Sequence, residues 1–303
     1  GRFYIVTGAN SGLGFSVTKH LLYLGASVIM ACRHRKKAEA AKTRLLASFP
    51  EAQLFILVYD QADFTSIDEF VDQVKQHYSH FSGIIFNAGI YHPRRGMKTK
   101  QGFPLTMGVN YLGVFYLLRR LIEKGLLDKT HSRRLIFVGS LSWYRVKVSD
   151  SQAILTSEQG RMMSQYCRSK TALGALAYQL SRHQTQSHLY VPHNIGVYTM
   201  HPGTTGTNIV GNSSSSYPQW FARLADIALA LFVHGPDVAS LGIIKGLLDP
   251  SISEDHVIVP RGLFHISGYP MTKRYPHNLR QNGQTLIEKT SAVLATFDHS
   301  ELV

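Results

Sequence analysis

TGANSGLG, residues 7–14, lies between the apolar run RFYIV and a stretch of helical length that begins near Leu13. Its glycines are spaced G-x-x-x-G-x-G, which permits a tight turn and a close approach of the backbone to a ligand. The amino end of the following helix would direct N–H groups toward an anion. The stretch could be only a flexible turn, but a strand before it and a helix after it favour a dinucleotide-binding loop. The loop residues expected to bind the dinucleotide are Gly8, Asn10, Ser11, Gly12, Leu13 and Gly14.

The alternation of apolar runs and helical stretches continues along the first two-thirds of the chain. Runs of strand length lie at 2–8, 26–32, 53–60, 82–89, 133–140 and 193–201, and helical stretches at 13–24, 36–48, 64–78, 105–127 and 161–184. Strands that alternate with helices form parallel βαβ units, and runs this apolar are buried on both faces of a sheet. The pattern predicts an α/β fold: a Rossmann-type, doubly wound parallel sheet with helices on both faces and ligands at the carboxyl ends of its strands.

The pattern changes after His201. The polar run GNSSSSYPQW (211–220) leads into the apolar FARLADIALALF, so we expect a hinge and a C-terminal substrate lid at about 204–235. A last strand at 256–260 and a helix at about 278–295 complete the predicted fold. Because no linker or internal repeat divides the chain, residues 1–303 are predicted to form a single domain.

The chain is basic, with 32 Lys and Arg against 19 Asp and Glu and a formal charge of +13. These positive residues are scattered and lack interleaved aromatic residues for base stacking, so nucleic acid is not an expected partner. The charge and an apolar lid are compatible with attachment to an anionic membrane surface, although no motif indicates it. No apolar run reaches the roughly 20 residues of a membrane span, and the chain opens without a signal-peptide pattern.

The cysteines and histidines indicate neither a disulfide framework nor a metal site. Cys32 and Cys167 have no metal-ligand spacing, and the 15 histidines form no HExxH motif or paired cluster. We therefore expect no metal. Two isolated thiols fit a reducing compartment, so a cytoplasmic location is predicted.

The ends of the second, third and fourth predicted strands extend the nucleotide site. The second ends in CRHR (32–35), without the acid that would accept from a ribose 2′-hydroxyl. Arg33 is placed to bind a 2′-phosphate, which favours NADP(H) over NAD(H); an ordinary surface arginine is the alternative. Asp60 could accept from the adenine amino group, and Asn87 and Gly89 end the fourth strand, although each could be only a turn residue.

Tyr166 and Lys170 stand four residues apart in QYCRSK (165–170), within the helix expected at 161–184. Positions i and i+4 share a helix face, so the ammonium can reach the phenol. A cation about 4 Å away lowers the pKa of a phenol by roughly three units, and burial of the phenol offsets part of this decrease. That shift would bring a group with a pKa of about 10 toward a useful range. Taken alone, the pair is also compatible with a solvated helix face.

Taken together, these motifs resemble the short-chain dehydrogenase/reductase family from Phe3 to about Ile209. The matching elements, in order, are TGANSGLG, Asp60, NAG (87–89), Asn110 in GVNYLGVF, VGS (138–140), YCRSK (166–170) and HPGTTGT (201–207). ACR at the second strand end, GVNYLG and YCRSK are most similar to the retinol dehydrogenase and WW-domain oxidoreductase branch. Two positions depart from the family pattern: Phe86 precedes NAG, and Gln61 follows Asp60, which bears on the shape of the adenine pocket.

The resemblance implies a role for each matched side chain. Tyr166 is the general acid/base, Lys170 tunes it and binds the ribose, and Ser140 donates a hydrogen bond to the substrate oxygen. Asn110 holds a proton-relay water near Lys170, while Ser142 is the alternative for the serine role. Beyond the glycine loop, the implied cofactor contacts are Arg33, Asp60, Gln61, Asn87, Ala88, Gly89, Tyr166, Lys170, Pro202, Gly203 and Thr205.

The predicted function is therefore NADP(H)-dependent interconversion of a carbonyl and an alcohol. Residues after Gly89, Trp143, Tyr144 and the 204–235 segment would line the pocket. Their aromatic members, which also include Tyr91, Trp220 and Phe221, indicate a small apolar substrate, unless they only pack the lid. The alternative is a catalytically silent NADP(H)-binding sensor or scaffold, against which the four intact catalytic positions argue. The family likeness also implies a homodimer or homotetramer joined through the two long helices.

Overall fold

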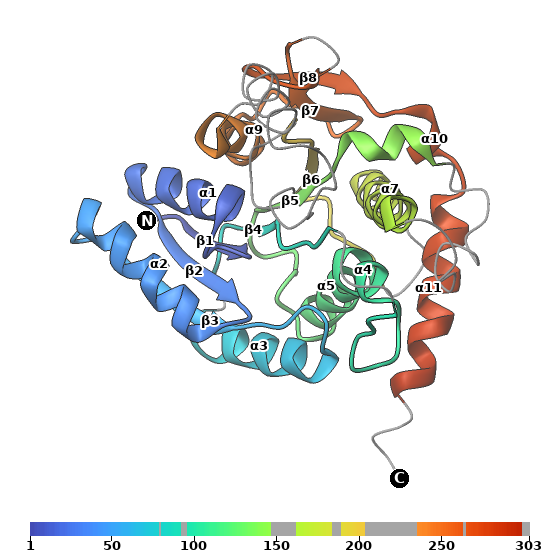
Figure 1. Cartoon of the computed structure of the whole chain (residues 1–303), viewed down its shortest axis with the longest axis horizontal. Coiled ribbons are helices and arrows are strands. Elements are labelled where there is room, and N and C mark those ends of the chain that lie inside the picture. Colours follow the sequence, from blue (N-terminus) through green and yellow to red (C-terminus); the bar gives the residue numbers. More distant parts are fainter. Residues whose placement is uncertain are drawn as a thin grey trace, which may run out of the picture.

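A single eight-stranded sheet runs through the computed structural model, with helices on both of its faces (Figure 1). The structure describes residues 1–78, 80–91, 96–146, 162–183, 189–203, 235–262 and 265–298. The strands are β1 (Phe3–Thr7), β2 (Ser27–Cys32), β3 (Leu54–Val58), β4 (Gly83–Phe86), β5 (Arg133–Val138), β6 (Ile195–Met200), β7 (His256–Pro260) and β8 (Pro270–Arg274). Their order in the sheet is β3-β2-β1-β4-β5-β6-β7-β8.

The order reverses direction at β1, which pairs in parallel with both β2 and β4. All pairings from β3 through β7 are parallel, and β8 alone pairs antiparallel with its neighbour, β7. Residues at the centre of β1, β2 and β5 are fully buried, as strands covered on both faces must be. The predicted α/β doubly wound sheet is confirmed. The crevice beyond the carboxyl ends of β1 and β4 is where such sheets bind ligands.

Helices cover both faces of the sheet (Figure 1), and the two largest apolar cores lie one on each face. One face is covered by α1 (Gly12–Tyr23), α2 (Arg35–Ser48) and α9 (Pro236–Leu248). The other is covered by α3 (Phe64–His77), α5 (Gly113–Glu123), α7 (Met162–Ser181) and α11 (Gly283–Asp298). The short elements are α4 (Leu105–Met107), a π-helix (Gly108–Leu112), a 3-10 helix (Leu141–Arg145) and α10 (His277–Arg280).

The C-terminal helix α11 packs on α7 and on the π-helix. Leu286, Ile287 and Leu294 of α11 are fully buried in the same core as α5 and α7. The Tyr111 hydroxyl lies 2.9 Å from the Thr290 hydroxyl, and both side chains are buried. Much of the surface of α5 and α7 is thereby covered from within the chain.

Three features differ from the sequence prediction. The stretch expected as one helix at 105–127 contains a π-helix, and neither α9 nor β8 was predicted. Most of the predicted lid, residues 204–234, lies outside the described residues, and so do Thr205, Trp220 and Phe221.

Candidate active site

The glycine loop between β1 and α1 is held by backbone contacts that leave no room for side chains. Gly8 and Gly12 have φ of 68° and 52°, the left-handed region that favours glycine. A Cβ added to Gly14 would lie 2.3 Å from the Gly8 carbonyl oxygen and 2.6 Å from Asn87 Nδ2. The start of α1 therefore presses directly against the loop and against the end of β4.

Asn87 and Thr7 join the loop to β4. Asn87 Nδ2 donates to the Thr7 carbonyl at 2.8 Å, and the backbone N–H groups of Asn87 and Ala88 both donate to Thr7 Oγ1 at 2.9 Å. Thr7 is fully buried. Asn87, which was predicted to contact the cofactor, thus holds the backbone of the loop in place.

The residues of this loop fit the pyrophosphate of a dinucleotide. Ser11, the N-cap of α1, makes no side-chain hydrogen bond to the helix, so its side chain does not occupy the first-turn N–H groups. A Cβ at Gly14 would push the start of α1 away from the loop, because it would clash with the Gly8 carbonyl and Asn87. An exposed helix start with glycines on both sides is the arrangement that binds phosphate.

At the end of β2, Cys32 and Arg33 have opposite environments. The Cys32 thiol is buried beneath the loop; burial raises its pKa to about 11, and hydrogen bonds from the backbone of Ala9 and Asn10 lower it in part. Arg33 is exposed, and its Nε donates to His34 Nε2 at 3.1 Å. The guanidinium thus reaches solvent next to the loop, where the sequence predicted a 2′-phosphate.

Beyond β3, the side chains of Asp60 and Gln61 differ in burial and in their hydrogen-bond partners. Asp60 Oδ1 accepts from the backbone N–H of Ala62 at 3.0 Å, and the residue is only partly buried. The Gln61 side chain is buried: its Nε2 donates to the carbonyls of Ala88 and Val109, and its Oε1 accepts from Tyr59. Gln61 was predicted to contact the cofactor, but its amide instead ties the ends of β3 and β4 to the π-helix.

Tyr166 and Ser140 meet where α7 crosses the end of β5. Burial raises the pKa of the Tyr166 phenol, and a side-chain hydrogen bond with Ser140 lowers it in part. Ser140 caps the 3-10 helix by accepting from the Ser142 N–H at 3.2 Å. The Ser142 hydroxyl is buried without a hydrogen-bond partner in the described part of the chain. Of the two candidate serines, the structure brings Ser140 to Tyr166.

Lys170 lies one turn after Tyr166 and is almost fully buried. Its Nζ donates to the Val138 carbonyl at 2.9 Å, and burial lowers its pKa to about 8. A Cβ on Gly89 would lie 3.4 Å from that Nζ and 3.1 Å from Asn110 Oδ1. Gly89, just after β4, therefore packs closely against the side chains of Lys170 and Asn110.

The tuning expected from sequence is not seen at Tyr166. Lys170 was predicted to lower the pKa of the phenol, yet that pKa is raised, because the cost of burying a phenolate outweighs its hydrogen bond with Ser140. The Lys170 ammonium is itself destabilised by burial and bonds to a backbone carbonyl. Protein groups alone thus leave Tyr166 protonated, as a proton donor must be.

Asn110 lies in the π-helix, and its side-chain amide is fully used. Its Oδ1 accepts from the Ile90 N–H at 2.8 Å, and its Nδ2 donates to the Ile90 carbonyl at 2.9 Å and to Ser169 Oγ at 3.0 Å. Ser169 in turn donates to the Tyr166 carbonyl at 2.8 Å. Asn110 thus joins β4, the π-helix and α7.

The end of β6 is described as far as Gly203, which donates its N–H to His201 Nδ1 at 3.2 Å. Pro202 and Gly203 follow β6 on the same sheet edge as the other predicted contacts. Trp143 was expected to line the substrate pocket, but it is fully buried in a core with Val257, Tyr275 and Leu279. The side chain of Tyr144 lies outside the described residues.

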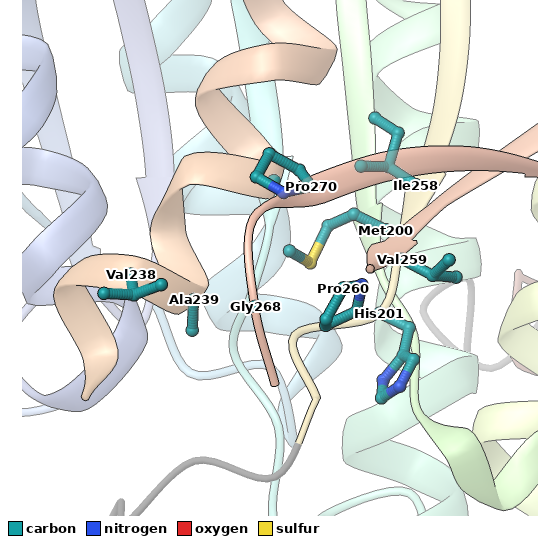
Figure 2. A pocket seen from close by; sticks show the side chains of 10 residues that line it. Met200, His201, Val238, Ala239, Ile258, Val259, Pro260, Gly268 and Pro270 are labelled. Atoms are coloured by element: carbon teal, nitrogen blue, oxygen red, sulfur yellow. The ribbon is translucent and has the colours of Figure 1, made fainter. Parts of the chain in front are cut away.

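A small pocket lies between α9, the end of β6 and the β7–β8 hairpin (Figure 2). Its lining includes Met200, His201, Ala239, Ile258 and Pro270, and none of the predicted catalytic side chains. Within the described ranges, no group of three or more metal-ligating side chains is assembled. No helix among the described residues has the length and hydropathy to cross a membrane.

The fold and these motifs agree with comparisons to known proteins. Residues 2–218 match the short chain dehydrogenase family, so the chain belongs to that family. It is 34% identical over 221 residues to retinol dehydrogenase 14 of Mus musculus, a match that spans 69% of this chain and 63% of that protein. It is 31% identical over 231 residues to a WW domain-containing oxidoreductase of Drosophila melanogaster, over 74% of this chain and 53% of that protein. These relatives support the branch indicated by the motifs.

Solved structures share the fold. An uncharacterized protein from Mycobacterium paratuberculosis superposes with a TM-score of 0.72 at 22% identity, covering 96% of this chain and 93% of that one. A variant of actinorhodin polyketide ketoreductase, crystallised with NADPH, gives a TM-score of 0.64 at 16% identity and covers 84% of this chain and 93% of its own. These likenesses show the fold that the chain shares with them, in agreement with its membership of the short chain dehydrogenase family.

Proposed function

We propose that the protein interconverts a carbonyl and an alcohol on a small apolar substrate with NADP(H), and that Tyr166 is its general acid/base. The observation that carries the proposal is that Ser140, at the end of β5, lies close enough to Tyr166 of α7 to lower the pKa of its phenol. Lys170 is buried one turn along, and the glycine loop lies at the same edge of the sheet. The named relatives include retinol dehydrogenases, which supports an alcohol or carbonyl substrate.

The proposed mechanism assigns one proton to Tyr166. A bound nicotinamide supplies the hydride to the carbonyl carbon, or accepts it in the reverse direction. In reduction, the Tyr166 hydroxyl gives its proton to the carbonyl oxygen, and Ser140 stabilises the charge that develops there. Lys170 carries a positive charge at neutral pH, because its pKa is about 8, and it lies one helical turn along α7 from the phenolate left on Tyr166. In oxidation, the same groups act in reverse.

The experiment is a panel of carbonyl compounds followed by loss of NADPH absorbance. Aromatic aldehydes, steroid ketones, quinones and retinal would each be offered to the wild type and to Tyr166→Phe. We expect turnover of at least one compound by the wild type and a loss of about a hundredfold or more in the variant. If NADPH binds but the wild type turns over nothing in either direction, the catalytically silent sensor is the better account.

The preference for NADP(H) rests on Arg33, which is exposed beside the glycine loop. A planar guanidinium binds a phosphate through two parallel hydrogen bonds. Arg33→Ala should weaken NADPH binding about tenfold and leave NADH binding within about twofold, as measured by fluorescence titration. Arg35→Ala is the matched control, because Arg35 is exposed on α2 and pairs with Glu39 at 3.6 Å. An unchanged NADPH to NADH ratio in Arg33→Ala would refute the assignment.

The remaining predictions concern assembly and location. We propose that residues 1–303 form one domain, which the continuous eight-stranded sheet supports. We propose a homodimer or homotetramer joined through the two long helices, with α11 packed on α7 in each copy; light scattering measures the mass. Neither Cys32 nor Cys167 is in a disulfide, which is compatible with the predicted cytoplasmic location, and cell fractionation tests it.

A further inference from the structure

Tyr91 lies next to Tyr166 although no motif singles it out. It follows Ile90, whose N–H and carbonyl are both hydrogen-bonded to the Asn110 side chain at 2.8 and 2.9 Å. The backbone that carries Tyr91 is thus fixed to the π-helix. Its side chain is partly exposed, so it borders the open side of the site.

The Tyr91 ring contacts α7 at two points. Its centroid is 4.9 Å from that of the Tyr166 ring, with the planes at 85°, an edge-to-face pair. Its hydroxyl donates to Met163 Sδ at 3.6 Å, and Met163 lies about one turn before Tyr166. Met163 is 43% exposed, so this contact is at the surface of the site and not in the core.

We propose that Tyr91 is a positioning residue for proton transfer, which holds the Tyr166 ring so that its hydroxyl stays at Ser140. The proposal rests on the proposed function. The Tyr166 side chain turns about two bonds, and Ser140 restrains it only at the hydroxyl. The edge-to-face contact restrains the ring itself, while the contact with Met163 keeps Tyr91 against α7.

The same ring limits the access of water to the phenol. Burial is the largest cause of the raised pKa of Tyr166. Ser140 lowers this pKa, while Cys167 and Tyr91 raise it. Lys170 lies one turn further along α7, and its Nζ bonds to the Val138 carbonyl. Tyr91→Leu should admit water and lower the pKa of Tyr166. The rate of carbonyl reduction falls at high pH as Tyr166 loses its proton. In Tyr91→Leu this fall should occur at lower pH than in the wild type.

The test compares Tyr91→Phe, Tyr91→Leu and the control Tyr23→Leu, which removes an exposed ring at the end of α1. On the carbonyl that the wild type reduces fastest, Tyr91→Phe should keep kcat within about threefold, because the ring pair remains. Tyr91→Leu should lower kcat about tenfold with KM within about twofold, as expected for loss of an aromatic pair that acts on the reacting group. Tyr23→Leu should behave as wild type. Unchanged kcat and pH profile in Tyr91→Leu would overturn the proposal.

A readout without turnover separates this proposal from the proposed function. In protein labelled at tyrosine ring carbons, the Tyr166 signal is identified by its loss in Tyr166→Phe. Tyr91→Leu should shift that signal, because the ring current of Tyr91 is removed, and Tyr91→Phe should leave it nearly in place. If the Tyr166 signal shifts in Tyr91→Leu but the wild type reduces no carbonyl, the contact between the two rings is supported and the proposed function is refuted. A signal that moves in neither variant would refute the contact itself.

Discussion

The glycine loop and the Tyr166 site lie at one edge of the sheet but are built in opposite ways. At the loop, Gly8 and Gly14 have no side chains, so backbone segments can lie in direct contact, and the Asn87 amide bonds to the Thr7 carbonyl. At the Tyr166 site, polar side chains are buried and hold one another, as Asn110 and Ser169 do. Substitutions should therefore act by steric conflict at the loop and through charge and hydrogen bonding at the Tyr166 site.

The steric side of this comparison is tested most strongly at Gly14. Gly14→Ala places a Cβ 2.3 Å from the Gly8 carbonyl oxygen, which is backbone and cannot rotate away. We expect a loss of about 3 kcal/mol or more in the free energy of unfolding, and loss of measurable NADPH binding. Urea unfolding and fluorescence titration measure these quantities. Gly235→Ala is the control, since its Cβ meets nothing within 4 Å. Equal effects of the two changes would mean that the loop tolerates side chains.

The polar side is tested at the two serines before α7. Ser140→Ala removes the hydrogen bond to Tyr166, so kcat should fall about a hundredfold. Ser142→Ala removes a buried hydroxyl that has no hydrogen-bond partner among the described residues, and kcat should stay within about threefold. Steady-state kinetics on one carbonyl decides between them. A larger loss in Ser142→Ala would reverse the assignment of the serine role.

Lys170 makes the stability of the protein depend on pH. Its pKa is lowered from 10.5 to about 8 on folding, so the unfolded chain binds more protons between these values and stability rises with pH across that window. Lys170→Met should stabilise the protein at pH 7 by about 2 kcal/mol, roughly 3 from burial less about 1 for the hydrogen bond to Val138. Above pH 10.5 the contribution from burial should vanish, so Lys170→Met should no longer be more stable than the wild type.

Urea unfolding at pH 7, 9 and 10.5 measures this difference, with Lys19→Met as the control, because the Lys19 side chain is 44% exposed. A gain in Lys170→Met that does not depend on pH would show that folding does not lower the pKa of Lys170.

The smallest effect concerns the support of the π-helix by α11. Tyr111→Phe removes the buried hydrogen bond with Thr290, which keeps its own bond to the Leu286 carbonyl at 2.7 Å. We expect a loss of about 1 kcal/mol in the free energy of unfolding by urea. Tyr23→Phe, at an exposed tyrosine, should change nothing. If Tyr111→Phe is neutral, α11 is held by apolar packing alone.

Sequence alone predicted the parts of the site that depend on local chain conformation. A strand, three glycines and a helix determine the loop from within eight residues, and β1 to β7 were recognisable because each is almost wholly apolar. Tyr166 and Lys170 were identified by their spacing on one helix, and Ser140 by its place after a strand. The family resemblance then supplied their roles, which stay predictions, and the structure places Ser140 close to Tyr166.

The parts that sequence did not predict depend on distant contacts. The Gln61 amide bonds to Val109, 48 residues away, and Asn110 bonds to Ser169, 59 residues away, so no local pattern reveals either role. Strand β8 reads PMTKR, which is too polar to be recognised as a strand, because it lies at the edge of the sheet. Helix α9 carried a usable start signal, Pro236 followed by Asp237, but its glycines weaken the helical pattern.

The most direct test of the central claim measures NADPH affinity and turnover in the same preparations of wild type and Tyr166→Phe. The phenyl ring keeps the edge-to-face contact with Tyr91 and loses only the hydroxyl that meets Ser140. The account predicts a dissociation constant for NADPH within about threefold of wild type. It predicts that kcat falls by about a hundredfold or more. Tyr166→Phe with wild-type kcat would contradict it, because the proton would then come from another group.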